Sequence, residues 1–362
     1  MKNLIVFSLL SLASPLVAQE ATEEVVEKFS IHGYLTQAWA KSDGEQILGI
    51  SKQGTTDYRR AAVLLRFSPT PKDSLVIQLA HRRLGLSPVS SQEPDVKLDW
   101  AFYSRDLGAN TSLRVGRLPQ PLGIHNETRY VGTLLPFYRA PYNFYQEGSF
   151  TSETIDGAMI GHAISPDSSW NAEVSAYGGG FTMFETTAQG PRPTRAEKGI
   201  GAQVWLNTPL SGLRFGVGAM RMELAQSASG KDRWNNLSAS AEYAGERVKV
   251  RSEYRRTRTT AVESEFDNYY VYGGVNVTPR LVLHAQFDTC TLSFLAAPGF
   301  RLDVDKFYRD QTLGASFAAR PDVVIKAEYH WTKSQLIETN PAAITGPARP
   351  ANYFIASMSV SF

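Results

Sequence analysis

The sequence predicts an all-β protein, a transmembrane antiparallel β-barrel of about sixteen strands. From Phe29 onward, short stretches alternate between apolar and polar residues, and a period of two indicates strands whose faces meet different environments. Tight turns alternate with longer loops, as they do in outer-membrane barrels. Aromatic residues gather near the expected strand ends, which suits the aromatic belts at the two membrane interfaces.

The first eighteen residues have the pattern of a signal peptide. Lys2 supplies a positive charge, Leu4 to Ala13 form a short apolar run, and the small residue Ala18 would precede the cleavage site. The apolar run is far shorter than the roughly 20 residues that a spanning helix needs. We therefore expect residues 1–18 to be removed on export and residues 19–362 to form a single barrel domain.

Composition excludes several other classes. The formal net charge of the chain is only +2, so charge gives no reason to expect a nucleic-acid partner. Cys290 is the single cysteine, which excludes an intramolecular disulfide and a cysteine-based metal site. We expect no cofactor and no metal.

The alternating stretches can be counted as sixteen strands separated by seven tight turns and eight longer loops. A barrel of ~16 strands is wide enough to leave an aqueous channel. A β-sandwich alternates in the same way, but the turn pattern and the aromatic belts favour the barrel, and counts of 14 or 18 stay open. The expected strands are 29–39, 57–68, 74–82, 96–106, 112–118, 154–164, 169–178, 197–207, 213–224, 234–244, 247–258, 266–278, 281–292, 305–319, 323–336 and 352–362.

The third loop, residues 119–153, is the longest stretch without a periodic pattern. Such excursions inside a compact fold are usually functional. Several aromatic residues alternate here with charged or titratable ones, which suits a loop packed on the inner wall of a barrel. We expect it to fold into the lumen as a constriction loop; the alternative is an exposed loop that binds a partner. Its candidate site residues are His125, Glu127, Arg129, Arg139 and Glu147.

A strand that ends in the pair Gly116–Arg117 leads to a Pro-x-Gly pattern at 121–123 and then to Asn-x-Thr-Arg at 126–129. In this arrangement the N-terminal third of the chain resembles the phosphate-selective porin (O/P-like) family. Two short stretches, Ile31–Trp39 and Thr56–Ala61, share the resemblance, and the terminal strand ending in Phe362 is similar to the C-terminal signature of outer-membrane barrels. The resemblance implies a sixteen-stranded homotrimeric porin of the bacterial outer membrane whose third loop narrows the pore. The residues that match the family around the start of the third loop are Gly116, Arg117, Pro121, Gly123, Asn126, Glu127, Thr128 and Arg129.

If the apolar faces contact lipid, many basic residues point into the lumen, because Arg or Lys at mid-bilayer on the lipid face costs ~2–4 kcal/mol. Cations along a low-dielectric wall concentrate anions, and arginine suits phosphate and carboxylate groups. Seven carboxylates, at positions 99, 127, 147, 156, 242, 253 and 288, could oppose these cations. The expected pore-lining residues are Arg60, Arg66, Arg82, Lys97, Arg105, Arg114, Arg117, Lys249, Arg251 and Arg255.

The sequence therefore predicts a water-filled channel for passive diffusion of small hydrophilic solutes, favouring anions such as phosphate or carboxylates. Outer-membrane lipid and two further copies of the chain are the expected partners. An enzyme is disfavoured because the six histidines are scattered and neither the G-x-S-x-G nor the H-E-x-x-H pattern occurs. The alternative is a plugged barrel acting as an adhesin or a structural protein.

Overall fold

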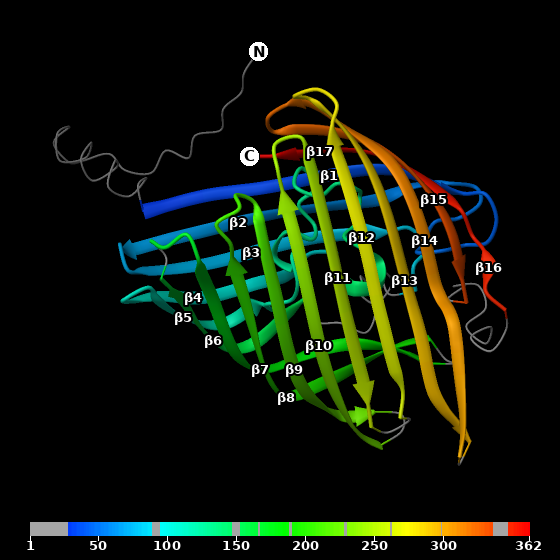
Figure 1. Cartoon of the computed structure of the whole chain (residues 1–362), viewed down its shortest axis with the longest axis horizontal. Coiled ribbons are helices and arrows are strands. Elements are labelled where there is room, and N and C mark those ends of the chain that lie inside the picture. Colours follow the sequence, from blue (N-terminus) through cyan, green and yellow to red (C-terminus); the bar gives the residue numbers. More distant parts are fainter. Residues whose placement is uncertain are drawn as a thin grey trace, which may run out of the picture.

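A computed structural model describes residues 28–88, 95–146, 153–165, 167–187, 190–227, 230–260, 263–297, 299–335 and 347–362. The expected signal peptide and Glu147 lie outside this part of the chain. The described strands form one closed antiparallel sheet in which neighbours along the chain pair with each other, and the first and last long strands pair to close the ring, with Tyr34 opposite Ser361. Figure 1 shows the resulting barrel.

Sixteen long strands form the barrel wall, as the sequence predicts. A further two-residue element, β16 (Arg349–Pro350), pairs with the end of β15. The long strands are β1 (Phe29–Ser42), β2 (Thr55–Thr70), β3 (Asp73–Leu84), β4 (Lys97–Gly108), β5 (Thr111–Pro119), β6 (Thr154–Ile164), β7 (Asn171–Thr187), β8 (Gly190–Asn207), β9 (Leu213–Ser227), β10 (Gly230–Ala244), β11 (Val248–Thr259), β12 (Glu265–Asn276), β13 (Leu281–Ala297), β14 (Phe300–Arg320), β15 (Val323–Ser334) and β17 (Tyr353–Ser361).

Three of the expected long loops are largely strand. β7 and β8 continue as a hairpin to Thr187 and from Gly190, and the hairpins β9–β10 and β13–β14 are extended in the same way. Alternation is weak there because glycine and proline interrupt it, as in residues 178–180 and 191–193. Backbone pairing nevertheless continues, and these hairpins lengthen one end of the barrel beyond the expected strand boundaries.

The outer wall is apolar, which is the reason these strands can lie in lipid. A closed sheet pairs its backbone groups internally, and this is the only β-structure that hydrocarbon tolerates. Large apolar side chains on this wall expose between 44% and 59% of their surface, and they include Leu35, Ile77, Ile160, Val217, Leu237, Leu283 and Ile325. The protein is therefore an outer-membrane type of multi-pass β-barrel, and its tight turns mark the periplasmic end.

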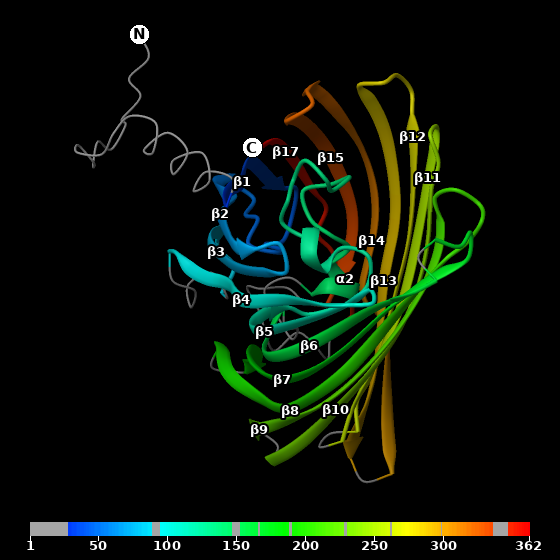
Figure 2. The same cartoon turned by 90° about the vertical axis from the view of Figure 1, so that its left-hand side faces the viewer.

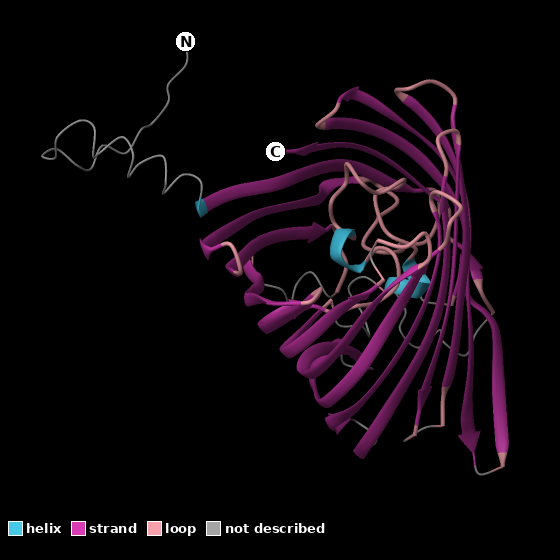
Figure 3. Cartoon of the chain, turned by 60° about the vertical axis from the view of Figure 1, so that its left-hand side comes forward, coloured by secondary structure: helices cyan, strands magenta, loops and turns pink. Residues whose placement is uncertain are grey.

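The loop between β5 and β6 folds into the barrel, as predicted. It contains the short 3-10 helix η1 (Asn126–Thr128) and the one-turn helix α2 (Tyr142–Tyr145), and Figures 2 and 3 show both inside the ring of strands. We call its described residues, 120–146 and 153, the constriction loop. Within the described residues, no helix is both long and apolar enough to cross a membrane.

Two predicted pore-lining residues lie on the outer wall instead. Pairing of β3 with β4 shifts by one residue beside Gln78, which inverts the alternation of β4. Arg105 therefore shares the face of exposed Leu107 and contacts Asp73, with 3.3 Å between Arg105 Nη1 and Asp73 Oδ1. The prediction that Arg105 points inward is wrong for this reason.

Arg117 also lies on the outer wall, but here the alternation of the strand is regular, because no bulge interrupts β5. Its register with β6 is continuous from Thr111 to Pro119, so Arg117 shares the face of Val115, which is 46% exposed. The guanidinium binds the Asp156 carboxylate on the same outer face through two contacts, Nε–Oδ1 at 2.7 Å and Nη2–Oδ2 at 3.1 Å. The prediction that Arg117 lines the pore is also wrong.

Candidate functional site

The constriction loop is held from several sides, and a buried carboxylate on β11 is its principal anchor. Glu253 accepts hydrogen bonds from the backbone N–H of Ile124 (2.9 Å) and from the hydroxyl of Tyr145 (2.6 Å), both in the loop. Hydroxyls of two wall residues, Tyr270 (2.7 Å) and Ser240 (2.6 Å), donate to the same carboxylate. Four donors therefore converge on one buried group, which holds the start of the loop at Ile124 and the helix α2 at Tyr145 against the wall.

Two further carboxylates hold the second half of the loop. Asp288 on β13 accepts from the backbone N–H of Asn143 (3.1 Å) and from its side-chain amide (2.9 Å). Glu328 on β15 accepts from the backbone N–H of Tyr138 at 2.8 Å. Both carboxylates satisfy loop donors that would otherwise be buried without partners, an arrangement that costs about 1–3 kcal/mol per group when it is broken.

Lys326 on β15 holds the loop through its carbonyl groups. Its Nζ donates to the carbonyl oxygens of Gly132, Leu135 (2.6 Å) and Phe137 (3.1 Å). An ammonium group has three donors and no acceptor, so three carbonyls satisfy it fully. Alternation alone puts Lys326 and Glu328 on the polar face of their strand, but sequence reasoning did not identify them as loop anchors.

Two glycines allow the loop to approach its surroundings closely. Gly123 has φ +58°, and a Cβ there would lie 2.4 Å from Glu253 Oε1 and 2.6 Å from Tyr145 Oη. A Cβ on Gly132 would lie 2.2 Å from Ser359 Oγ. The Pro-x-Gly pattern that begins at Pro121 is therefore explained by the space and the left-handed backbone that position 123 requires.

Arginines and tyrosines join the loop to β2 and β3. Arg60 donates to the carbonyl of Tyr138 at 2.5 Å, and its guanidinium carbon lies 4.3 Å from the centre of that ring. Arg82 hydrogen-bonds to the Tyr130 hydroxyl and lies 2.8 Å from Glu153. Both arginines point inward, as predicted, but they bind the loop rather than face open water.

The charged residues of the loop itself are mostly buried. Arg129 donates to Asn126 Oδ1 and to the carbonyl of Tyr145, and Arg139 donates to the carbonyl of Leu48. Burial, reinforced by Arg251 and Arg214 nearby, lowers the pKa of His125 to about 3. His125 is therefore neutral at ordinary pH. Glu127 is the one predicted residue of the described loop with an exposed side chain, 57%.

Glu153 forms an electrostatic clamp at the end of the loop. Burial alone would raise its pKa, but Arg82, Lys97 and Arg129 together lower it well below the ordinary range. Lys97 Nζ and Arg129 Nη2 lie 3.8 Å and 3.9 Å from its carboxylate oxygens. Because the folded pKa is depressed, the stabilisation is present above the unfolded value of about 4.3 and is lost as pH falls below it.

We expect this clamp to give the channel a pH dependence. Below about pH 4.3 a released loop, in which Glu153 has its ordinary pKa, takes up a proton more readily than the clamped loop. Acidification from pH 7 to pH 3 should therefore favour release of the loop and increase the fluctuations of single-channel current. Glu153→Gln should already fluctuate at pH 7 and change less on acidification. Equal pH responses of the two proteins would show that Glu153 does not control the loop.

The remaining predicted residues face the lumen away from these anchors. Arg66 is exposed near the periplasmic end of β2, and Lys249 is half-buried on the inward face of β11. Arg114 Nη1 lies 3.8 Å from Glu127. Arg251 binds Glu242, with 2.6 Å between Nε and Oε1.

Arg214 is a lumen cation that sequence reasoning missed. Its Nη2 lies 2.7 Å from Oε2 of Glu242, so that Arg214 and Arg251 share one carboxylate. Two guanidiniums on one carboxylate leave a net positive charge on the wall. The alternation of β9 contained the signal, because Arg214 shares the inward face of buried Met220 and Met222.

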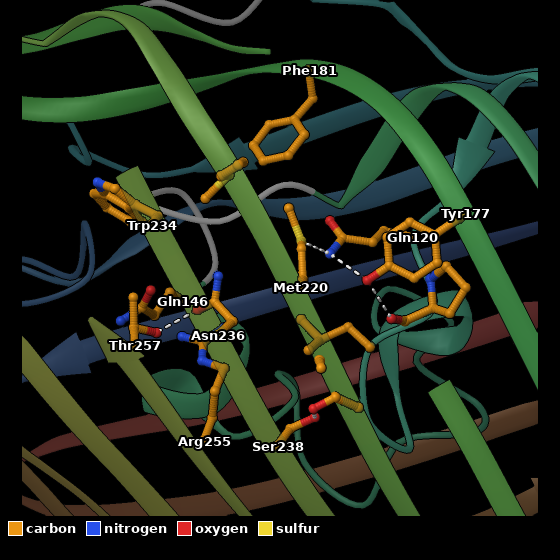
Figure 4. Close-up of a pocket in the computed structure, with 15 residues that line it drawn as sticks. Gln120, Gln146, Tyr177, Phe181, Met220, Trp234, Asn236, Ser238, Arg255 and Thr257 are labelled. Atoms are coloured by element: carbon orange, nitrogen blue, oxygen red, sulfur yellow. Dashed lines mark hydrogen bonds between the residues drawn. The ribbon is translucent and has the colours of Figure 1, made fainter. Parts of the chain in front are cut away.

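Two spaces lie on either side of the loop segment 120–122. The larger, of about 480 Å³, is at the end with the tight turns; we call it the periplasmic vestibule, and Arg114, Glu127, Glu173 and Arg214 are among its lining residues. The smaller, of about 30 Å³, lies on the other side of the segment; we call it the extracellular cavity (Figure 4). The loop separates them where Gln120 Nε2 lies 2.7 Å from Met220 Sδ and 3.4 Å from Tyr177 Oη.

Among the residues that the structure describes, no set resembles a metal centre. Within the described part of the chain, no group of three or more His, Cys, Asp or Glu side chains is arranged to hold a metal ion. The candidate site therefore consists of the constriction loop, the wall residues that anchor it and the two spaces beside segment 120–122.

Comparison with known proteins identifies the fold. No protein-family model matches the chain, and no curated protein matches it. Solved structures, in contrast, do match the chain. Salmonella typhi OmpF, in complex with daunomycin, is 10% identical with a TM-score of 0.64, and the match covers 92% of this chain and 97% of OmpF.

Two further solved structures match the chain over the same share of its length. OmpT, an outer-membrane protein of Vibrio cholerae, is 12% identical with a TM-score of 0.58, covering 92% of this chain and 97% of OmpT. An anion-selective porin from Comamonas acidovorans is 10% identical with a TM-score of 0.57, covering 92% of this chain and 99% of that porin. The chain therefore has the fold of outer-membrane porins.

Proposed function

We propose that the protein is a non-enzymatic porin through which small hydrophilic solutes diffuse, with a preference for anions. Charged side chains anchor the loop to β2, β3, β11, β13 and β15, whereas β7, β8 and β9 meet it through neutral groups of Gln120, Pro121 and Gly123. We therefore take the wall formed by β6–β10 as the side along which solutes pass. The path runs from the extracellular cavity past segment 120–122 into the periplasmic vestibule.

The observation that carries the anion preference is the sharing of Glu242 by Arg214 and Arg251. Three of the seven candidate opposing carboxylates are occupied elsewhere: Glu253 and Asp288 hold the loop, and Asp156 binds Arg117 on the outer wall. Phosphate or small carboxylates are the solutes that such guanidinium groups bind best. Relation to the phosphate-selective porins and assembly as a homotrimer in outer-membrane lipid are parts of the same proposal.

A plugged adhesive or structural barrel is the second candidate, and the small volume of the extracellular cavity favours it. Swelling of liposomes that contain the purified protein separates the two. We expect swelling in glycerol and faster entry of an organic anion than of an organic cation of matched size. Absence of swelling in every solute would contradict the porin and support the plugged barrel.

A further inference from the structure

Part of the lumen wall beside the extracellular cavity is apolar. Inward side chains from β7, β9 and β10 form one buried cluster there, and those lining the cavity are Tyr177, Phe181, Met220, Met222 and Trp234. Open porin lumens are lined mainly by polar groups. A wall of thioethers and aromatic rings offers no favourable interaction to an inorganic anion, whereas it lowers the free energy of an apolar group that leaves water.

A cation faces this wall. Arg255 on β11 lines the same cavity and is only 2% exposed. Its Nη2 donates to the carbonyl of Asn143 at 3.3 Å, while its Nε has no hydrogen-bond partner in the described structure. No carboxylate of the described residues forms an ion pair with it. A buried charge without a counter-ion is costly, so an incoming anion would gain from pairing with it.

Neutral polar groups complete the lining. Asn236 accepts a hydrogen bond from Thr257 at 2.5 Å, beside Arg255 on the neighbouring strands. Gln120 and Gln146 of the loop line the same cavity (Figure 4). Amides and hydroxyls at this position can bind the polar end of a solute while its body contacts the methionines and rings.

We infer that the extracellular cavity is a binding site for slender organic monocarboxylates, with the carboxylate at Arg255 and an aromatic or aliphatic body against Met220, Met222 and Trp234. The cavity holds only about 30 Å³, room for about two water molecules. A solute therefore enters by displacing side chains, which unbranched methionines permit at low cost. This inference rests on the proposed porin function and narrows its solute class.

The test is a binding titration of the detergent-solubilised barrel with 3-phenylpropionate, propionate and 3-phenylpropanol, followed by tryptophan fluorescence, with single-channel conductance measured in parallel. Burial of the phenyl ring should make 3-phenylpropionate bind at least about tenfold more tightly than propionate. The alcohol, which lacks the charge, should also bind more weakly. Equal affinities for the two acids would overturn the inference.

Variants locate the site. Arg255→Gln and Met222→Ser should each weaken 3-phenylpropionate binding about tenfold, since each removes a charged or an apolar contact. The matched controls on the outer wall, Arg105→Gln and Met358→Ser, should bind as the unaltered protein does. Arg255→Lys keeps the charge and should retain most of the affinity, which distinguishes lost pairing from misfolding. Unchanged binding in both site variants would place the ligand elsewhere.

The two proposals fail differently. Step-like conductance without selective binding of 3-phenylpropionate would leave the porin function standing and overturn the site. Binding without conductance would contradict the porin function, because a plugged barrel could still hold the ligand.

Discussion

Glu253→Ala is expected to release the constriction loop and to raise the single-channel conductance severalfold. The substitution removes the acceptor shared by Ile124 N–H and the hydroxyls of Tyr145, Tyr270 and Ser240. The backbone donor of Ile124 cannot turn to another partner, and the loss of these bonds should destabilise the folded loop by about 2–4 kcal/mol. Planar-bilayer recordings and urea unfolding from lipid vesicles measure the two effects.

Glu253→Gln is the conservative comparison, because its amide oxygen still accepts two hydrogen bonds. It should show an intermediate conductance. Glu265→Ala is the control: it removes a carboxylate from the neighbouring strand β12 that pairs with Arg256 and Arg258, away from the loop. This variant should conduct as the unaltered protein does. If Glu253→Ala conducts like the unaltered protein, the buried carboxylate does not hold the loop.

The second large effect is a change of ion selectivity in the double variant Arg114→Glu and Lys249→Glu. Both residues are inward and half-buried. A unit charge about 7 Å from a permeating ion contributes about 0.6 kcal/mol in water. Reversing both charges should therefore lower the chloride-to-potassium permeability ratio about tenfold, after allowance for screening by salt.

Its control carries the same charge change on the outer wall. Arg105 and Arg221 are exposed on strand faces that point away from the lumen, so Arg105→Glu with Arg221→Glu should leave the zero-current potential nearly unchanged. An equal shift in both double variants would mean that the overall charge of the barrel, and not the lumen, determines selectivity.

Much of the barrel could be predicted because a period of two directly reports a wall with lipid on one side. The stretch from Leu281 to Asp288 is an example: its alternation gives both the strand and its orientation. Prediction failed for β4, where a one-residue shift beside Gln78 inverts the faces. A bulge of this kind leaves no mark in a short mixed sequence such as Trp100 to Tyr103, so Arg105 was assigned to the wrong side.

The position of the loop could be predicted from the sequence, but the residues that attach it to the wall could not. The mixture of rings and charges between Pro121 and Gln146 indicated a packed loop. Two of its anchors lie more than a hundred residues from the atoms they hold: Glu253 is 129 positions from Ile124, and Lys326 is 191 from Leu135. Alternation shows that such residues face inward, but only the three-dimensional arrangement shows which loop atom each one meets.

The central claim, an anion-favouring channel along the wall of β6–β10, is tested most directly by the zero-current potential of the purified protein in a planar bilayer under a KCl gradient. We expect a potential of the sign that shows chloride crossing more readily than potassium. A potential of the opposite sign would contradict the anion preference and assign the narrow part of the pore to its carboxylates, and a bilayer without step-like conductance would contradict the channel itself.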